Sequence, residues 1–146
     1  FFCNFMIGTY SGISHTQQIL NKPMIFLNTT PFIEKPYGMN NLFIPKKLLN
    51  LSNNKLISVK DSLMNGYFKI YNGNELNTHN LKYINNNKLE MIAAIEEFMK
   101  TYRKKNFIAS KNQVLFNKIF ENYNINLGNK NFICDSFLKK NQYLIS

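Results

Sequence analysis

The sequence is poor in the residues that hold metal ions. Its 146 residues include two cysteines and two histidines, and Cys3 and Cys134 lie too far apart for zinc-type spacing. It also lacks an Asp-x-Asp pair that could hold a divalent cation. These counts exclude the usual zinc clusters, and we expect both thiols to be free and buried in a reducing compartment.

Long apolar runs and arginine are also scarce. No run approaches the roughly 20 apolar residues that a membrane-spanning helix requires. Arg103 is the single arginine, which argues against base reading in a nucleic acid because that reading relies heavily on arginine.

Acidic residues are outnumbered by basic ones, 8 to 18, so the formal net charge is +10. This balance favours an anionic partner such as a nucleotide diphosphate, a nucleic acid or a membrane surface. The lysines are scattered rather than gathered in a run that could follow a nucleic-acid backbone, so we expect no nucleic acid. Asparagine, lysine and isoleucine are all frequent, so part of the lysine excess could reflect the overall composition of the sequence and carry no function.

One stretch, residues 5–28, organises the chain. Its pattern predicts a strand over 5–7, a loop over 8–12, a helix over 13–20 and a second strand over 24–28. Two apolar strands joined through a helix indicate a parallel βαβ unit. The loop after its first strand would lie at the carboxyl edge of the sheet, where ligands bind.

The loop has the residues of a phosphate-binding turn. Gly8 and Gly12 can adopt backbone angles that other residues avoid, and Ser11 can cap the helix, with Ser14 three residues further on. The free N–H groups and the dipole of a helix start together favour a phosphate. A plain tight turn between strand and helix would explain the same glycines.

Two motifs carry a resemblance to a known group of enzymes. The loop reads Gly-Thr-x-Ser-Gly-x-x-His over residues 8–15, and Leu-Phe-Ile-Pro-Lys follows at residues 42–46. The loop resembles the donor-side domain of two-domain (GT-B) glycosyltransferases, including heptosyltransferases, although Tyr10 stands where heptosyltransferases have aspartate. The pair of motifs is similar to that of bacterial glycosyltransferases associated with surface polysaccharides.

The resemblance implies a fold and an activity. The fold would be one Rossmann-like α/β domain over residues 1–146, with three layers and a mostly parallel sheet, preceded in the full protein by an acceptor-binding domain. The activity would be transfer of a sugar from a nucleotide-activated donor to a glycan acceptor without a metal. The location would be cytoplasmic or at the inner face of the membrane, with peripheral membrane association left open. A non-catalytic α/β module that binds a phosphorylated small molecule is the alternative.

Polar residues that follow the predicted strands are the candidate donor-binding residues. They are Gly8, Thr9, Ser11, Gly12, His15, Asn28, Thr29 and Lys46. Each of these residues also has a purely structural explanation. The loop and strand-end residues could form polar turns, His15 could pack or hydrogen-bond within the helix, and Lys46 could be an ordinary surface lysine. Glu34 could bind a ribose hydroxyl or be a solvated loop carboxylate, and the catalytic base cannot be identified.

Helical patterns fill most of the remaining chain. We expect a helix from Asn87, capped with Glu90, and another from Ser110, capped with Gln113 and ended near Gly128. Their predicted core-facing residues are Leu89, Ile92, Ile95, Phe98, Met99 and Tyr102 in the first, and Val114, Leu115, Ile119, Phe120 and Tyr123 in the second.

Shorter segments complete the prediction, and the first is a short buried strand over residues 42–44. Ser58 with Asp61 predicts the start of a short helix that stops at Gly66. Residues 67–71 read as extended, 72–87 as a polar connection, and 135–140 as a short helix.

Overall fold

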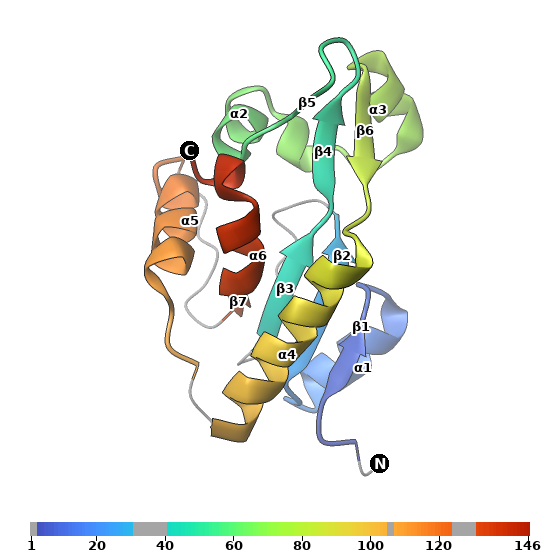
Figure 1. Cartoon of the computed structure of the whole chain (residues 1–146). Coiled ribbons are helices and arrows are strands. Elements are labelled where there is room, and N and C mark those ends of the chain that lie inside the picture. The colour runs from blue at the N-terminus through green and yellow to red at the C-terminus, as the bar shows by residue number, and fades with distance from the viewer. Residues whose placement is uncertain (1–2, 31–40, 105–106, 124–130) are drawn as a thin grey trace.

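The computed structural model describes residues 3–30, 41–104, 107–123 and 131–146, with residues 13, 15, 17, 18 and 131 described by their backbone. Its centre is a parallel sheet with strand order β1-β2-β3-β7. These strands are β1 (Met6–Gly8), β2 (Met24–Thr29), β3 (Asn41–Pro45) and β7 (Asn131–Ile133). The chain is therefore an α/β protein whose main sheet is compatible with a Rossmann-like fold (Figure 1).

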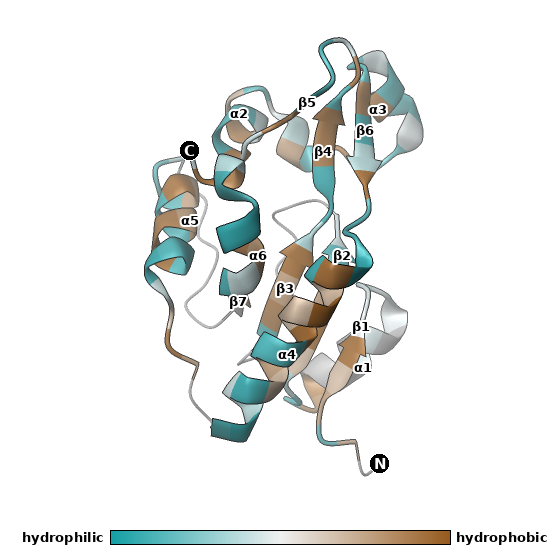
Figure 2. Ribbon diagram, in the orientation of Figure 1, coloured by the Kyte–Doolittle hydropathy of each residue, from teal (hydrophilic) through white to brown (hydrophobic). Residues whose placement is uncertain are grey.

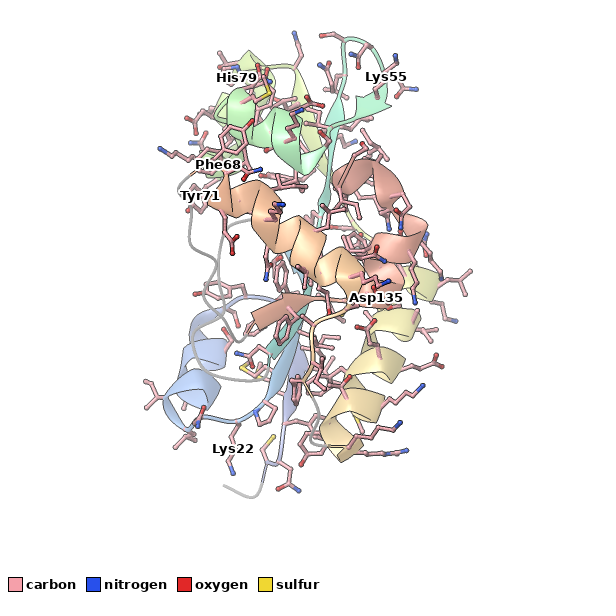
Figure 3. The ribbon with its side chains drawn as sticks, turned by 90° about the vertical axis from the view of Figure 1, so that its left-hand side faces the viewer. Lys22, Lys55, Phe68, Tyr71, His79 and Asp135 are labelled. Carbon is pink, nitrogen blue, oxygen red and sulfur yellow. The ribbon has the colours of Figure 1, made fainter. Side chains whose placement is uncertain are left out.

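The predicted βαβ unit is confirmed. Helix α1 (Gly12–Ile19) joins β1 to β2, and the two strands are parallel, with Met6 opposite Met24 and Gly8 opposite Phe26. Helix α1 lies on one face of the sheet and α4 (Lys88–Lys104) on the other (Figure 3). Because both faces are covered, the first three residues of β2 are fully buried.

A smaller antiparallel sheet, which the sequence reading did not predict, continues from the main one. It has the order β5-β4-β6, with β4 (Lys47–Asn50), β5 (Lys55–Leu56) and β6 (Leu81–Ile84). Strand β3 passes into β4 through Lys46, so one run of chain contributes to both sheets (Figure 1).

Short helices surround the smaller sheet. Helix α2 (Val59–Met64) starts as predicted, because the Ser58 side chain accepts a hydrogen bond from the backbone of Asp61. The extended reading of residues 67–71 was wrong, since Tyr67–Lys69 forms a 3-10 helix, η1. The reading of 72–87 as a connection was also wrong, since it contains α3 (Gly73–Thr78) and β6.

Helix α4 starts as predicted but buries a different face. Asn87 and Glu90 exchange backbone and side-chain hydrogen bonds at its start, and Phe98 is buried as expected. Leu89 and Ile92, however, are exposed, whereas Glu90 and Ala94 are buried. The core-facing side is therefore rotated from the predicted apolar stripe, and it includes Glu90, whose carboxylate pairs with Lys47.

The C-terminal part packs two further helices beside β7. The capping box of Ser110 and Gln113 is confirmed in α5 (Lys111–Glu121), and α6 (Asp135–Lys140) has its predicted bounds. Helix α5 ends at Glu121, and Gly128 lies outside the described residues. Phe120 is buried as expected and Ile119 is partly buried, but Val114, Leu115 and Tyr123 are exposed while Gln113 and Phe116 are buried. A 3-10 helix, η2 (Gln142–Leu144), follows α6.

Three sequence-based expectations about composition can be compared with the structure. Both cysteines are free, and Cys134 is buried, whereas Cys3 is exposed, contrary to expectation. Within the described ranges no helix has the length and apolar character to cross a bilayer. Nor do the described residues contain a group of three His, Cys, Asp or Glu side chains that could hold a metal ion.

Candidate functional site

A cavity of about 400 Å³ lies where three parallel strands end at their carboxyl edge. Its described lining residues follow β1, lie at the end of β2, or follow β3 and β6. They are Thr9, Tyr10, Asn28, Thr30, Lys46 and Asn85. The structure thus brings together three residues proposed from separate parts of the sequence, namely Thr9, Asn28 and Lys46.

Lys46 is the charged group among the described lining residues. It is half-buried at the junction of β3 and β4, and its backbone N–H donates to the carbonyl of Thr29 at 2.9 Å. The ion pairs among the described residues are Lys47–Glu90 and Lys139–Asp135, so the ammonium of Lys46 is not neutralised there. A half-buried cation beside hydroxyl and amide groups is suited to an anionic ligand.

Asn28 forms a bulge at the end of β2. The register with β3 passes from Leu27 to Thr29 across one intervening residue, and Asn28 has a φ of 56°, in the left-handed region that asparagine tolerates. Its side-chain oxygen accepts a hydrogen bond from the backbone of Asn86 at 2.7 Å. The side chain therefore supports the cavity wall as well as lining it.

Unpartnered polar atoms lie in this same corner of the protein. Asn86 donates to the carbonyl of Pro45 at 2.8 Å, but its side-chain oxygen is buried with no partner among the described residues. The hydroxyl of Thr29 is likewise buried and unpartnered. Thr29 was expected to face the ligand, but it is 2% exposed and is not among the described lining residues.

The glycine loop differs in detail from the expectation. Gly66 is the described glycine with a positive φ, so Gly8 and Gly12 do not require angles that other residues avoid. A Cβ added at Gly12 would meet no atom within 4 Å, but Gly8, Ser11 and Gly12 are not among the described residues that line the cavity. The backbone N–H of Ser11 is already occupied, because it donates to the hydroxyl of Ser14 at 3.2 Å.

Some candidate residues cannot be placed beside the cavity. His15 lies within α1, and its side chain is outside the described part of the structure, as is the whole of Glu34. Tyr10 and Asn85 line the cavity although the sequence reading did not select them. Asn85 could have been found only by recognising β6, since it follows that strand as Lys46 follows β3.

A buried ion pair joins β4 of the smaller sheet to the start of α4, next to the site. The ammonium of Lys47 lies 2.6 Å from a Glu90 oxygen, and that carboxylate also accepts from the backbone of Asn87 and the side chain of Asn141. Burial on its own would raise the pKa of Glu90, but these hydrogen bonds and the nearby positive charge outweigh it and lower the pKa. Glu90 is therefore a structural carboxylate rather than a proton carrier.

A second hollow, about 470 Å³, lies among α4, α5 and α6. Two of the three carboxylates that line its described part are occupied, since Glu97 accepts the backbone N–H groups of Asp135 and Ser136, and Asp135 accepts the hydroxyl of Ser110. Burial would raise the pKa of Asp135, but hydrogen bonds from Lys139, Ser110 and Asn112 hold it below its ordinary value. These contacts join three helices, and we assign this region to packing.

Comparisons with protein-family models, with curated proteins and with solved structures find no match for this chain. The resemblance to glycosyltransferases therefore rests on the two sequence motifs alone. In the structure, each motif contributes one lining residue to the carboxyl-edge cavity, Thr9 from the first and Lys46 from the second.

Proposed function

We propose that the carboxyl-edge cavity binds the diphosphate of a nucleotide-activated sugar, and that this chain is the donor-binding part of a glycosyltransferase. The convergence of Thr9, Asn28 and Lys46 on one cavity is the observation that carries this proposal. A ligand at the carboxyl edge of parallel strands also follows the general rule for open α/β sheets.

The reaction would place growing negative charge beside Lys46. The acceptor hydroxyl oxygen forms a bond to the anomeric carbon while the bond from that carbon to the diphosphate oxygen breaks. The electron pair leaves with the diphosphate, whose charge the Lys46 ammonium and the Thr9 hydroxyl would stabilise. In the architecture that the resemblance implies, the base that takes the hydroxyl proton belongs to the acceptor-binding domain.

The start of α1, which follows Thr9 and Tyr10 but is not itself among the described lining residues, would supply a second contact for the same diphosphate. Gly12 is the first residue of this helix, is exposed, and has open space around its α-carbon. A phosphate oxygen can therefore approach the main chain closely, and the helix dipole favours its charge.

Titration with nucleoside diphosphates, with inorganic phosphate as reference, tests the binding step. We expect Lys46→Met to weaken nucleoside diphosphate binding about tenfold, because a charge-assisted contact is lost. Lys22→Met is the matched control, since Lys22 lies before β2, at the opposite edge of the sheet (Figure 3). An equal loss of affinity in the two variants would show that only the overall charge matters and would contradict the proposed site.

Gly12→Val tests the loop separately. The variant adds side-chain atoms where the structure has room for them, so the fold should tolerate the change while the ligand is held away. An unchanged affinity would remove the helix start from the site.

The transfer step needs its own measurement. We expect transfer of sugar from a nucleotide-activated donor only when the acceptor-binding part of the enzyme is present. Binding with the predicted dependence on Lys46, but without transfer by the complete protein, would instead establish the alternative, a non-catalytic module for phosphorylated small molecules.

A further inference from the structure

The outer face of α4 exposes apolar side chains near its start. Leu89 is 70% exposed and Ile92 is 40% exposed, and residues three apart lie on the same side of a helix. In Figure 2, brown residues are concentrated in the upper half of α4, and the lower end is teal. The exposed face is therefore apolar at one end and hydrophilic at the other.

A shallow hollow of about 400 Å³ occupies the hydrophilic end of this face. Its described lining residues all belong to α4, and they are Ile95, Glu96, Met99, Lys100, Arg103 and Lys104. Ile95 and Met99 are half-buried, so they give the hollow an apolar floor, while the cations are its more exposed members.

The cations of the hollow are available to a ligand. Lys100, Arg103 and Lys104 make no ion pair among the described residues, and they outnumber the carboxylate of Glu96 three to one. Residues 89, 92, 96, 100 and 103 follow helical spacing, so the apolar side chains and the cations share one face about 20 Å long.

We propose that the outer face of α4 docks on a membrane that contains anionic phospholipids. The headgroup phosphate lies in the hollow, where Arg103 can bind two of its oxygens and Lys100 adds a point charge. Leu89 and Ile92 enter the boundary between headgroups and acyl chains. Exposed apolar residues that insert and basic residues that attract anionic lipids each strengthen the binding of a protein at the membrane interface.

Charge complementarity favours a lipid surface over a protein partner. The chain carries a formal net charge of +10, which opposes self-association and attracts an anionic surface. Each basic side chain near an anionic membrane adds to the attraction, whatever the exact position of the lipids. A stable protein interface instead requires a complementary surface over a larger area.

Co-sedimentation with vesicles tests the proposal. We expect the protein to bind vesicles made of equal parts phosphatidylglycerol and phosphatidylcholine, and to bind vesicles of phosphatidylcholine alone much more weakly. Lys100→Gln and Arg103→Gln should each lower partitioning about fivefold. Leu89→Gln and Ile92→Gln should each lower it about tenfold, because an inserted apolar side chain is lost.

Two control variants separate this face from general properties of the protein. Lys55→Gln removes a cation from the smaller sheet, at the far end of the molecule from the basic end of α4 (Figure 3). Val114→Gln removes a side chain of α5 that is 56% exposed. We expect both variants to partition like the original protein.

Three outcomes would overturn the proposal. The first is equal loss in Lys55→Gln and Arg103→Gln, which would indicate diffuse charge attraction. The second is unchanged partitioning in Leu89→Gln and Ile92→Gln. The third is a change of oligomeric state in those two variants, measured by size-exclusion chromatography with light scattering, which would identify the face as a protein interface.

Discussion

The side-chain oxygen of Asn28 accepts a hydrogen bond of 2.7 Å from the backbone N–H of Asn86. The bond joins the bulge at the end of β2 to the segment that precedes α4. Both residues lie at the carboxyl edge, next to the cavity that Asn28 helps to line. The wall of the candidate site is therefore held by a polar contact between segments 58 residues apart.

Asn28→Ala should lower the free energy of unfolding by about 2–3 kcal/mol. The variant removes a partner from a partly buried N–H and places alanine in a left-handed conformation. Asn28→Gly should cost about 1–2 kcal/mol, because glycine tolerates that conformation. Urea unfolding measures both values.

The control for this experiment is Asn54→Ala. Asn54 has a φ of 54° and is exposed, so the variant reports the backbone cost alone, which we expect to be about 1 kcal/mol. Equal destabilisation in Asn28→Ala and Asn54→Ala would show that the bond to Asn86 contributes nothing.

Glu90→Gln should destabilise the protein by about 3 kcal/mol at neutral pH, because it leaves the mostly buried Lys47 ammonium without a counter-charge. Removing both charges in Lys47→Met with Glu90→Gln should cost less than the sum of the single changes. A strictly additive double variant would contradict a direct interaction between the two side chains.

The stability contributed by ionised Glu90 should depend on pH in the acid range. Its pKa is lower in the folded protein than its ordinary value of 4.5, so the unfolded chain binds the proton first as the pH falls. The contribution is complete above about pH 4.5 and is lost as the pH falls through the folded pKa. Asp135 is shifted in the same direction, so the difference between the original protein and Glu90→Gln isolates Glu90.

Ser110→Ala should cost more stability than Ser58→Ala. Both serines cap a helix, but the hydroxyl of Ser110 also donates to Asp135 at 2.6 Å and so ties α5 to α6. We expect about 1 kcal/mol for loss of the Ser58 cap and about 2–3 kcal/mol for Ser110. Thermal or denaturant unfolding of the two variants, measured in parallel, gives the comparison, and equal values would contradict a stabilising link between the helices.

Gly66→Ala should destabilise the protein by about 1 kcal/mol, whereas Gly12→Ala should not. Gly66 has a φ of 72° after α2, in the region that alanine avoids. Gly12 has a helical backbone and free space around it, and alanine favours the helix. A loss of stability in Gly12→Ala would show that this glycine has a structural role that the present geometry does not reveal.

The sequence predicted the parallel core because local signals and tertiary structure agree there. The apolar runs before Gly8, after Pro23 and around Phe43 are short and bounded by turn residues, and each is a strand of the parallel sheet. Caps were equally readable, since Ser58, Asn87 and Ser110 act through contacts three residues away. The sequence also indicated that Thr9, Asn28 and Lys46 lie close together, because the carboxyl ends of parallel strands meet at one edge of the sheet, and all three line one cavity.

Features set by distant contacts could not be predicted. In the sequence Glu90 is recognisable only as a capping residue of α4, but in the structure it is also buried against Lys47 and Asn141, while part of the predicted apolar stripe faces solvent. Strand β6 lies in a polar, asparagine-rich stretch, and its pairing partner is β4, more than 30 residues earlier. Because β6 was not predicted, Asn85, which follows it and lines the cavity, was not selected as a candidate.

Lys46 is the single residue between a strand of the parallel sheet and a strand of the antiparallel one. Because Lys46 connects the two sheets covalently, a ligand held by its ammonium would also restrict the start of β4. Ligand capture at the cavity should then slow hydrogen exchange as far away as Leu48 and Tyr83, which are partners across β4 and β6. A ligand bound at Lys46 would therefore stabilise both sheets at once.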